Sequence, residues 1–559
     1  MNNKNKLNFI QEIIENDLKL GFKKKKLKFR FPPEPNGYLH IGHAKSIFLN
    51  FNLGKYYNVP VNLRFDDTDP NKNYKKFIKP IKEDIKWLGF NWKKECYSSD
   101  YFEKLYDFAI YLIKIGKAYV DDQSQKIINE QRKTPFIKGI KSIYRNRKIE
   151  ENLFLFNEMK KGTFKEGYCV LRAKIDMNSP NMHLRDPIMY RIIKKSHFKT
   201  KNKWNIYPTY DWSHGQCDYI EKISHSICSN EFENHKPLYN WYIKEINNIN
   251  KKKIIPKQYE FSRLNLTNTI LSKRILNFLI EKKIIKGWDD PRILTIIGMR
   301  RRGYPSESII DFCKLIGLNK RNNIIPFYLL ENIVRKYLNK ISIKVMVVIN
   351  PLKLVIINYN YDKTELLYIK KNKNRIIPFC KYIYIEKKDF SLKKNFFRLK
   401  IGKKVRLKNA YIIKAISYKK NKKGNFTKVY CKYYPDTLSD NSFSNLNIVK
   451  KKLNKKNKVK STIHWVSTKE YLPIKIRIFK KLFNKNILDI NNKEEILKNI
   501  NKNSLKIYSA YAEPFLKKAK FMYRFQFKRI GYFCLDKDSK IKEKKFIFNK
   551  IVSLKEKQK

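Results

Sequence analysis

The chain lacks the features that would place it in an oxidising compartment or in a membrane. Its eight cysteines are scattered along 559 residues without a CxxC pair, and a chain of this size needs no disulfide framework. No apolar run approaches the ~20 residues of a membrane span. Acidic residues interrupt the apolar pattern of the first 21 residues, so a signal peptide is not indicated. We expect a soluble, cytoplasmic protein that does not associate with membranes.

Acidic residues are scarce compared with basic ones. The chain has 123 Lys and Arg against 50 Asp and Glu, which gives a formal net charge of +73. Such a field attracts polyanions, and nucleic acid is the first candidate. A drift of the whole composition towards Lys, Asn and Ile, visible in NKNILDINNKEEILKNI, explains the same excess. The charge therefore permits RNA binding without requiring it.

The length and apolar content predict several folded domains. Hydrophobic residues make up 42% and aromatic residues 14% of the chain, too much for a disordered protein. A chain of 559 residues is several times the usual domain length, so several packed units are expected. We found no internal repeat, and the Lys- and Asn-rich stretch from about 448 to 460 is expected to be a mobile loop.

The N-terminal pattern predicts a nucleotide-binding α/β unit. Apolar residues recur at helical spacing from Leu7 to Leu18, and Gly21 follows as a stop. The short strand Leu27 to Phe31 then runs into a Pro-rich turn and a helix that begins near His40. A second strand, VNLRF, ends in two aspartates, where parallel sheets bind ligands.

The hydrophobic pattern of the rest of the chain predicts four further regions. Mixed helices and strands indicate an insertion between two halves of the sheet, QYEFSRLNL and LSKRIL indicate a loop, and a helical region follows. Short β-rich runs beyond about residue 339 are typical of β-barrels. The predicted limits are 1–25 for an N-terminal helix, 26–100 with 204–264 for the α/β domain, 101–203 for the insertion, 265–338 for a mobile loop and helical connecting domain, and 339–559 for the barrels.

Two short motifs carry candidate chemistry. His40 and His43 lie at i and i+3 over the first turn of a helix, where imidazoles and free backbone N–H groups suit a triphosphate. Taken alone, an HxxH pair fits surface or zinc-binding histidines equally well. Lys273 could follow the departing phosphates as a mobile cation, but one lysine in so basic a chain is not informative by itself.

The full strings resemble the class I aminoacyl-tRNA synthetases. FRFPPEPNGYLHIGHAKS resembles the ATP-binding signature of their glutamine and glutamate branch, and LSKR resembles the mobile-loop motif that follows it. The resemblance to glutaminyl-tRNA synthetases extends through RFDDTDP, LRDPIMYR, KWNIYPTYDWSH, GWDDPR, MRRRGYPSES, IHWVS and GYFCLD. It implies a Rossmann-type α/β catalytic domain, an α+β insertion that binds the acceptor stem, a helical connecting domain and anticodon-binding β-barrels.

The resemblance also implies an activity and its site residues. It implies a monomeric ligase that uses ATP with Mg²⁺ to join L-glutamine to tRNA-Gln through glutaminyl-adenylate, with His40, His43 and Lys273 as catalytic groups. Asp66 would receive the α-ammonium of glutamine and Tyr210 would read its amide, with Arg30 and Cys228 as further pocket residues. The ATP site would comprise Glu34, Pro35, Asn36, His40, Ile41, Gly42, His43, Ala44, Lys45, Ser46, Ser229, Arg263, Leu264, Leu271, Ser272 and Lys273.

Contacts with RNA are implied at fewer positions. Arg529 aligns with an anticodon contact of the family, and a solvated Arg on a barrel face is the alternative. Asn234 stands where the family has an Asp that helps to choose the acceptor stem, which puts stringency in doubt. The run RRRGY, residues 300–304, offers cations and an aromatic ring suited to phosphate and base contacts.

Other departures from the family pattern are conservative, with one exception. Leu271, Ser229 and Asp69 replace the usual Met, Thr and Asn. Tyr219 and Lys222 replace the usual Ala and Gly in HGQCDYIEKIS, and the sequence offers no physical account of that change.

Three alternative interpretations stay open at this level. The pairs His214-x₂-Cys217 and His225-x₂-Cys228 mimic a zinc site, but the seven residues between them are fewer than finger-like sites have, so no structural metal is expected. A glutamyl-tRNA synthetase of the archaeal and eukaryotic type shares the signatures. A synthetase-like tRNA-binding protein without catalysis would share the fold but would not need the two histidines and the lysine.

Overall fold

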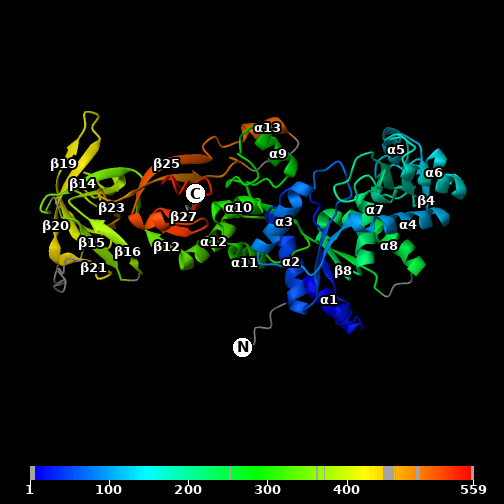
Figure 1. The fold of residues 1–559 in the computed structure, drawn as a ribbon, viewed down its shortest axis with the longest axis horizontal. Coiled ribbons are helices and arrows are strands. Elements are labelled where there is room, and N and C mark those ends of the chain that lie inside the picture. Colours follow the sequence, from blue (N-terminus) through cyan, green and yellow to red (C-terminus); the bar gives the residue numbers. More distant parts are fainter. Residues whose placement is uncertain are drawn as a thin grey trace.

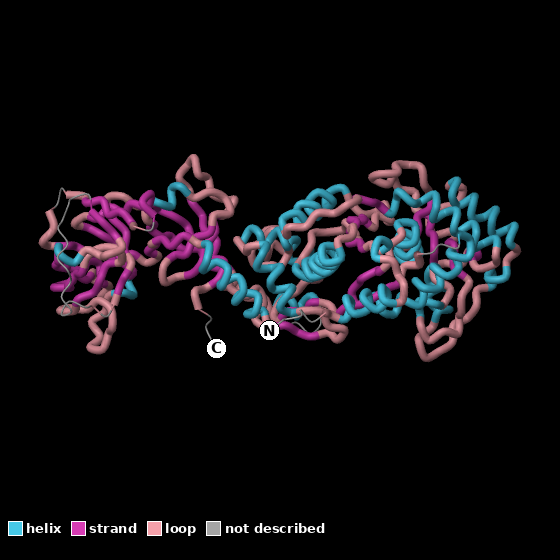
Figure 2. The backbone as a smooth tube through the Cα atoms, turned by 90° about the horizontal axis from the view of Figure 1, so that it is seen from below, coloured by secondary structure: helices cyan, strands magenta, loops and turns pink. Residues whose placement is uncertain are grey.

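The chain forms an elongated molecule with its β-rich C-terminal region at one end and most of its helices, together with the smaller sheets, at the other (Figures 1 and 2). The computed structural model describes residues 7–250, 254–360, 363–370, 372–444, 459, 461–485 and 492–555. The expected mobile stretch, 448–460, lies outside them apart from one residue. Within the described part of the chain, no helix is long and apolar enough to cross a membrane.

A parallel sheet forms the centre of the α/β domain. The strands β1 (Phe29–Phe31), β2 (Val61–Phe65) and β3 (Glu95–Tyr97) pair in parallel, as do β8 (His225–Ser229) and β9 (Lys257–Phe261). The two pieces meet where the backbone N–H of Ser224 donates to the carbonyl of Lys28 over 3.1 Å. The strand order is therefore β3-β2-β1-β8-β9. Folds of this kind bind nucleotides at the carboxyl ends of the central strands, which here are β1 and β8.

The helices around this sheet follow the apolar pattern of the sequence. The helix α1 (Phe9–Lys19) begins at Asn8, whose side chain accepts from two backbone N–H groups, and buries Ile10 and Ile14. The helix α2 (Ile41–Tyr57) packs closely on β2, because a Cβ atom at Gly54 would lie 2.3 Å from Val61 Cγ2. The helix α3 (Lys75–Trp87) covers the same region.

The insertion is built on an antiparallel sheet of four strands in the order β4-β5-β6-β7. Its hydrophobic core also takes in apolar side chains of α7 and α8, so the core continues beyond residue 203. The predicted limits of this domain stay a prediction. Its elements are α4 (Phe102–Lys114), β4 (Ala118–Asp121), α5 (Gln125–Arg132), α6 (Ile149–Lys161), β5 (Val170–Ala173), β6 (Ile188–Ile192), β7 (Ile206–Pro208), α7 (Tyr210–Glu221) and α8 (Lys236–Asn250).

The segment expected to be a loop contains strands. QYEFSRLNL forms β9 and then β10 (Leu264–Leu266), which pairs in parallel with β11 (Asn323–Ile325). Two residues between β9 and β10, and the residues between β10 and α9 (Lys273–Glu281), are irregular. The connecting helices α10 (Ile296–Arg302), α11 (Ser306–Ile316) and α12 (Phe327–Ile341) follow, and their core includes Cys534 and Ile551 of the C-terminal region.

Two seven-stranded sheets make up the C-terminal region, at the left of Figure 1. A three-stranded sheet packs beside the second and contains β16 (Asn372–Phe379), β15 (Glu365–Ile369) and β21 (Ser442–Ser444). The first contains β12 (Ile343–Val345), β26 (Arg524–Phe527), β27 (Gly531–Leu535), β28 (Phe546–Val552), β24 (Leu472–Phe479), β25 (Leu505–Ala512) and β13 (Val347–Val348). The second contains β22 (Thr462–Ile463), β18 (Lys404–Leu407), β19 (Ile412–Lys420), β20 (Phe426–Tyr434), β14 (Pro351–Ile356), β17 (Tyr382–Glu386) and β23 (Trp465–Ser467).

The end of α7 holds a residue in a strained backbone conformation. Lys222 ends α7 with φ 60° and ψ 41°, a left-handed conformation that costs an L-residue about 1–2 kcal/mol. Glycine adopts it freely but loses more entropy on folding, so we expect Lys222→Gly to stabilise the protein by about 0.5–1 kcal/mol. Urea unfolding measures the difference. Lys222→Ala keeps the strain and should not stabilise, and an equal gain in both variants would contradict the backbone explanation.

Candidate functional site

A cavity of about 450 Å³ opens where β1 and β8 end and α2 begins. Its walls come from segments far apart in the sequence, which the parallel sheet brings to one edge. The lining residues include Arg30, Pro32, Pro33, Glu34, Asn36, His40, Gly42, His43, Ser46, Tyr210, His214, Cys228, Ser229, Glu231, Phe232, Arg263, Leu264, Leu271 and Lys273.

The two histidines of the first signature are held as neutral hydrogen-bond donors. Nδ1 of His40 accepts from the backbone N–H of Gly42, and Nδ1 of His43 accepts from the backbone N–H of His40, each over 3.1 Å. A neutral ring that accepts at Nδ1 carries its proton on Nε2. Burial, with the nearby Lys273 and Arg263, lowers the pKa of His40 to about 3, and burial and the His40 ring lower the pKa of His43 well below its usual value. Both rings therefore offer Nε2–H at physiological pH.

Gly42 is required by the histidine in front of it. A Cβ atom at position 42 would lie 2.9 Å from Cε1 of His40, which is closer than carbon atoms normally approach. A larger residue would displace the His40 ring from its hydrogen bond to the start of α2. The glycine between the two histidines therefore preserves the orientation of the first.

Lys273 reaches the cavity from the start of α9 on the opposite wall. Its ammonium donates to Oδ1 of Asn36, and Asn36 in turn donates to Glu34. Burial lowers the pKa of Lys273 to about 8, with Glu34 opposing and Lys72 adding to the shift. The cation lies on the same cavity as the two imidazoles, although 230 residues separate Lys273 from His43 in the chain.

The other residues predicted for ATP divide into two groups. Glu34, Asn36, Gly42, Ser46, Ser229, Arg263, Leu264 and Leu271 line the cavity, whereas Pro35, Ile41, Ala44, Lys45 and Ser272 do not. The ammonium of Lys45 is buried and donates to the carbonyl oxygen of Ser262 over 2.7 Å. The structure therefore places Lys45 between α2 and the end of β9, away from the cavity.

The residues predicted for glutamine are also divided. Tyr210, Cys228 and Arg30 line the cavity, and the ring of Tyr210 stacks on His214 with centroids 4.9 Å apart. Asp66 does not line it; its Oδ2 lies 3.5 Å from Nδ1 of His214, which does.

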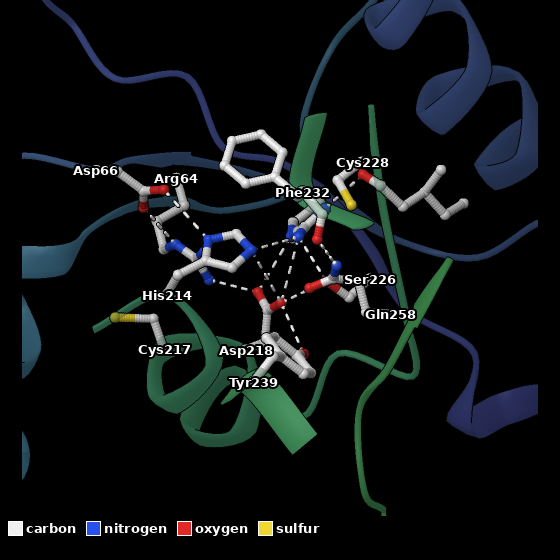
Figure 3. A network of polar contacts seen from close by, with 12 residues as sticks. Arg64, Asp66, His214, Cys217, Asp218, Ser226, Cys228, Phe232, Tyr239 and Gln258 are labelled. Atoms are coloured by element: carbon white, nitrogen blue, oxygen red, sulfur yellow. Dashed lines mark hydrogen bonds and ion pairs between the residues drawn. The ribbon is translucent and has the colours of Figure 1, made fainter. Parts of the chain in front are cut away.

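Behind the cavity, buried charges form a network (Figure 3). Asp218 accepts from Nε of Arg30 over 3.1 Å and from Nη1 of Arg64 over 2.7 Å. Arg64 also donates to Asp66 over 2.9 Å, and it contacts Glu221 over 3.3 Å. Although burial opposes ionisation, Arg64 lowers the pKa of Asp66 to about 2. Arg30 and Arg64 likewise lower the pKa of Asp218 far below its usual value.

The sequence signal for this network is weak. The sequence suggests His214 only as a zinc ligand, and it does not predict Arg64, Asp218, Phe232 or Glu231. Two features of the sequence could have indicated it: an arginine, Arg64, within the apolar strand VNLRF, and the spacing of His214 and Asp218 at i and i+4. The four residues of the apparent zinc motif do not come together, because His225 pairs with Asp17 over 3.2 Å while His214 faces the two arginines.

The predicted RNA contacts lie in different settings. Asn234 is exposed beside the insertion, and its carbonyl accepts from the side chain of Asn181 over 2.8 Å. Arg529 lines a cavity of about 370 Å³ between the C-terminal sheets and pairs with Asp389 through two contacts of 2.6 and 2.7 Å.

Most side chains of the run RRRGY are engaged in contacts within the protein. Arg301 bonds to Asp536 through Nε and Nη2 over 3.0 and 3.1 Å, and Tyr304 is completely buried. Arg302 donates to the carbonyl of Ile551 over 3.1 Å. Arg301 and Arg302 therefore join α10 to the C-terminal sheet, whereas the Arg300 side chain is 25% exposed and lies 3.8 Å from Asp84. An RNA contact at this run stays a prediction, for Arg300 in particular.

Family profiles account for most of the chain. The profile described as tRNA synthetases class I (E and Q), catalytic domain, matches residues 26–340. Two profiles for anti-codon binding domains of the same class match residues 344–434 and 462–536.

Curated relatives match over nearly their whole length. The chain is 47% identical over 566 residues to a glutamine–tRNA ligase of Clostridium kluyveri, and the match covers 99% of this chain and 98% of that protein. It is 48% identical over 581 residues to the glutamine–tRNA ligase of Buchnera aphidicola subsp. Schizaphis graminum, covering 100% and 99%. A third relative with this name, from Clostridium perfringens, is 46% identical and covers 98% of each chain.

Proposed function

Since the chain belongs to the class I tRNA synthetases of the E and Q type, we propose that it joins L-glutamine to tRNA-Gln at the expense of ATP. It is an aminoacyl-tRNA ligase, and the similarity to glutamine–tRNA ligases extends through both anticodon-binding profiles. The observation that carries the proposal is the cavity that joins His40, His43 and Lys273 to the pocket of Tyr210.

The first step is attack of the glutamine carboxylate on the α-phosphorus of ATP. One carboxylate oxygen bonds to phosphorus while the bond to the bridging oxygen breaks, so pyrophosphate leaves and glutaminyl-adenylate forms. Charge grows on the phosphate oxygens, where the Nε2–H groups of His40 and His43 and the ammonium of Lys273 supply fixed donors. The amino acid then passes to a ribose hydroxyl of the tRNA and AMP leaves. Mg²⁺ would enter with the phosphates of ATP.

The charge balance behind the cavity supports binding of the glutamine ammonium near Asp66. Each ring nitrogen of His214 lies near an arginine, at 3.0 and 3.2 Å, and near a carboxylate, with Asp66 3.5 Å from Nδ1 and Asp218 3.8 Å from Nε2. Among the arginines and carboxylates of this network, two guanidinium groups face three carboxylates, those of Asp66, Asp218 and Glu221, so one carboxylate has no guanidinium of its own. A buried site with one uncompensated carboxylate favours a cation. Because Asp66 lies behind His214, this requires a small shift of that ring when glutamine binds.

We propose a reducing cytoplasm as the location and a monomer as the working form. All eight cysteines, each of which the structure describes, are free thiols. Free buried thiols persist where disulfides are kept reduced, which supports this location.

The lowered pKa of Lys273 leads us to expect a fall of activity in alkaline solution. Because burial lowers its pKa to about 8, the free enzyme loses this charge above that pH, and kcat/KM for ATP should fall about tenfold per pH unit. His40 and His43 stay neutral through the same range and add no change near pH 6.5. Steady-state kinetics from pH 6 to 10 test this. Lys273→Arg keeps its charge and should flatten the alkaline limb; a wild-type profile that stays flat far above pH 8 would contradict the assignment.

Aminoacylation with all four pairings of substrates tests the proposed function. The purified protein is supplied with ATP and Mg²⁺, tRNA-Gln or tRNA-Glu, and labelled glutamine or glutamate. We expect product only from glutamine with tRNA-Gln. Glutamate on either tRNA would move the protein to the sister specificity, and no product from folded protein would leave a tRNA-binding protein without catalysis.

A further inference from the structure

Three potential metal ligands from separate segments meet beside the part of the cavity lined by Tyr210 and His214. His183 lies on the 3-10 helix η4 (Met182–Leu184), Asp211 is the second residue of α7, and His235 ends η5 (Asn230–His235). One ligand atom from each lies within 4.8 Å of the others, and the two imidazole rings are 3.7 Å apart. Within the described part of the chain, no other group of three His, Cys, Asp or Glu residues meets this criterion.

We propose that these three residues bind a divalent transition metal of the Zn²⁺ type. Two imidazoles and one carboxylate are a ligand set typical of Zn²⁺, with bonds of about 2.0–2.2 Å and a fourth position open to water. Tetrahedral ligands at such lengths lie roughly 3.4 Å apart, so small side-chain rotations bring the three atoms into place. The hydrogen bond of 2.7 Å between Nδ1 of His235 and Asp211 already holds two ligands together.

The backbone under the three side chains is well held. Trp212 and Leu238, close to Asp211 and His235 in the chain, are 0% and 1% exposed and belong to the core of the insertion. Asn181 donates to the carbonyl of Asn234 over 2.8 Å and accepts from the backbone N–H of His183 over 3.0 Å, so η4 and η5 are already joined. A bound ion would add a second link at this point. Side chains on rigid elements keep the ligand geometry that a metal needs.

The ligands are partly exposed, which allows the ion to enter from solvent. The side chains of His235 and Asp211 are 27% and 30% exposed. Arg132 also lies near His183, and its positive charge opposes a dication. We therefore expect an affinity weaker than that of a buried structural zinc site with four protein ligands.

Cobalt absorption tests the site without any measurement of catalysis. Protein stripped with a chelator is titrated with Co²⁺ while the visible d–d bands are recorded, and Zn²⁺ is then added in competition. We expect one Co²⁺ per chain, displaced by Zn²⁺, and a rise in Tm with Zn²⁺. His183→Gln and Asp211→Asn should weaken binding more than about 100-fold, because even an outer partner of a metal ligand costs 10–100-fold.

Asp17→Asn is the matched control. Asp17 also pairs with a histidine, His225, over 3.2 Å, but among the described residues no third ligand completes that pair. Its loss should leave Co²⁺ binding unchanged. The proposal fails if wild-type protein binds no Co²⁺ or Zn²⁺, or if His183→Gln and Asp211→Asn bind them as wild type does.

Discussion

Replacing His40 with asparagine should lower kcat/KM for aminoacylation by about 10²–10³ and leave the stability of the protein unchanged. His40 has two separable roles. Its Nδ1 accepts from Gly42 at the start of α2, and its Nε2–H faces the cavity as a donor. Asparagine is a favourable residue at this cap position, so its side-chain oxygen keeps the first role. It does not carry a donor out to the position of Nε2, and loss of one such donor typically costs 10²–10³ in rate.

His40→Ala separates the two effects. Alanine removes both the cap acceptor and the donor, so activity should fall as in His40→Asn and the unfolding free energy should fall by about 1 kcal/mol. Steady-state aminoacylation and urea unfolding of the three proteins measure both quantities. If His40→Asn keeps wild-type kcat/KM, or loses activity only because it unfolds, then His40 does not act as a donor to the reacting phosphate.

Replacing Asp218 with asparagine should destabilise the catalytic domain by about 3–5 kcal/mol. Asp218 is completely buried and accepts from Arg30, Arg64, Ser226 and Tyr239. Asparagine has nearly the same shape but no charge, so two buried guanidinium groups lose a counter-charge that the remaining carboxylates only partly replace. Urea unfolding and hydrogen exchange of α7 measure the loss.

An exposed carboxylate on another helix provides the comparison. Asp311 pairs with Lys314 one turn along α11 over 3.5 Å, and its side chain is 53% exposed. Asp311→Asn should therefore cost less than about 1 kcal/mol. Equal unfolding midpoints for Asp218→Asn and Asp311→Asn would mean that the buried network contributes no more to stability than a surface ion pair does.

Local patterns predicted the elements around the site. Apolar spacing from Leu7 to Leu18 and the Pro-rich turn before His40 predicted α1 and the start of α2. The two signatures predicted His40, His43 and Lys273, and all three line one cavity. Periodicity and short motifs depend on neighbouring residues, which is why the sequence alone reveals them.

Partners far apart in the chain were not predictable in this way. Asp218 lies 154 residues from Arg64 and 188 from Arg30, so no local pattern shows that one carboxylate serves both. The partners of RRRGY were not predictable for the same reason, because the carboxylate that holds Arg301 belongs to Asp536, 235 residues away. Basic runs look alike in sequence whether they face solvent or a distant acid.

The sequence by itself determined the class of enzyme, the position of its two signatures and the α/β start of the chain, because each depends on residues a few positions apart. Only the tertiary structure decided which side chains face the cavity, that Lys45 turns away from it, and that His183, Asp211 and His235 meet. These outcomes depend on how the sheet and the insertion pack together, and packing sets distances that spacing along the chain does not contain.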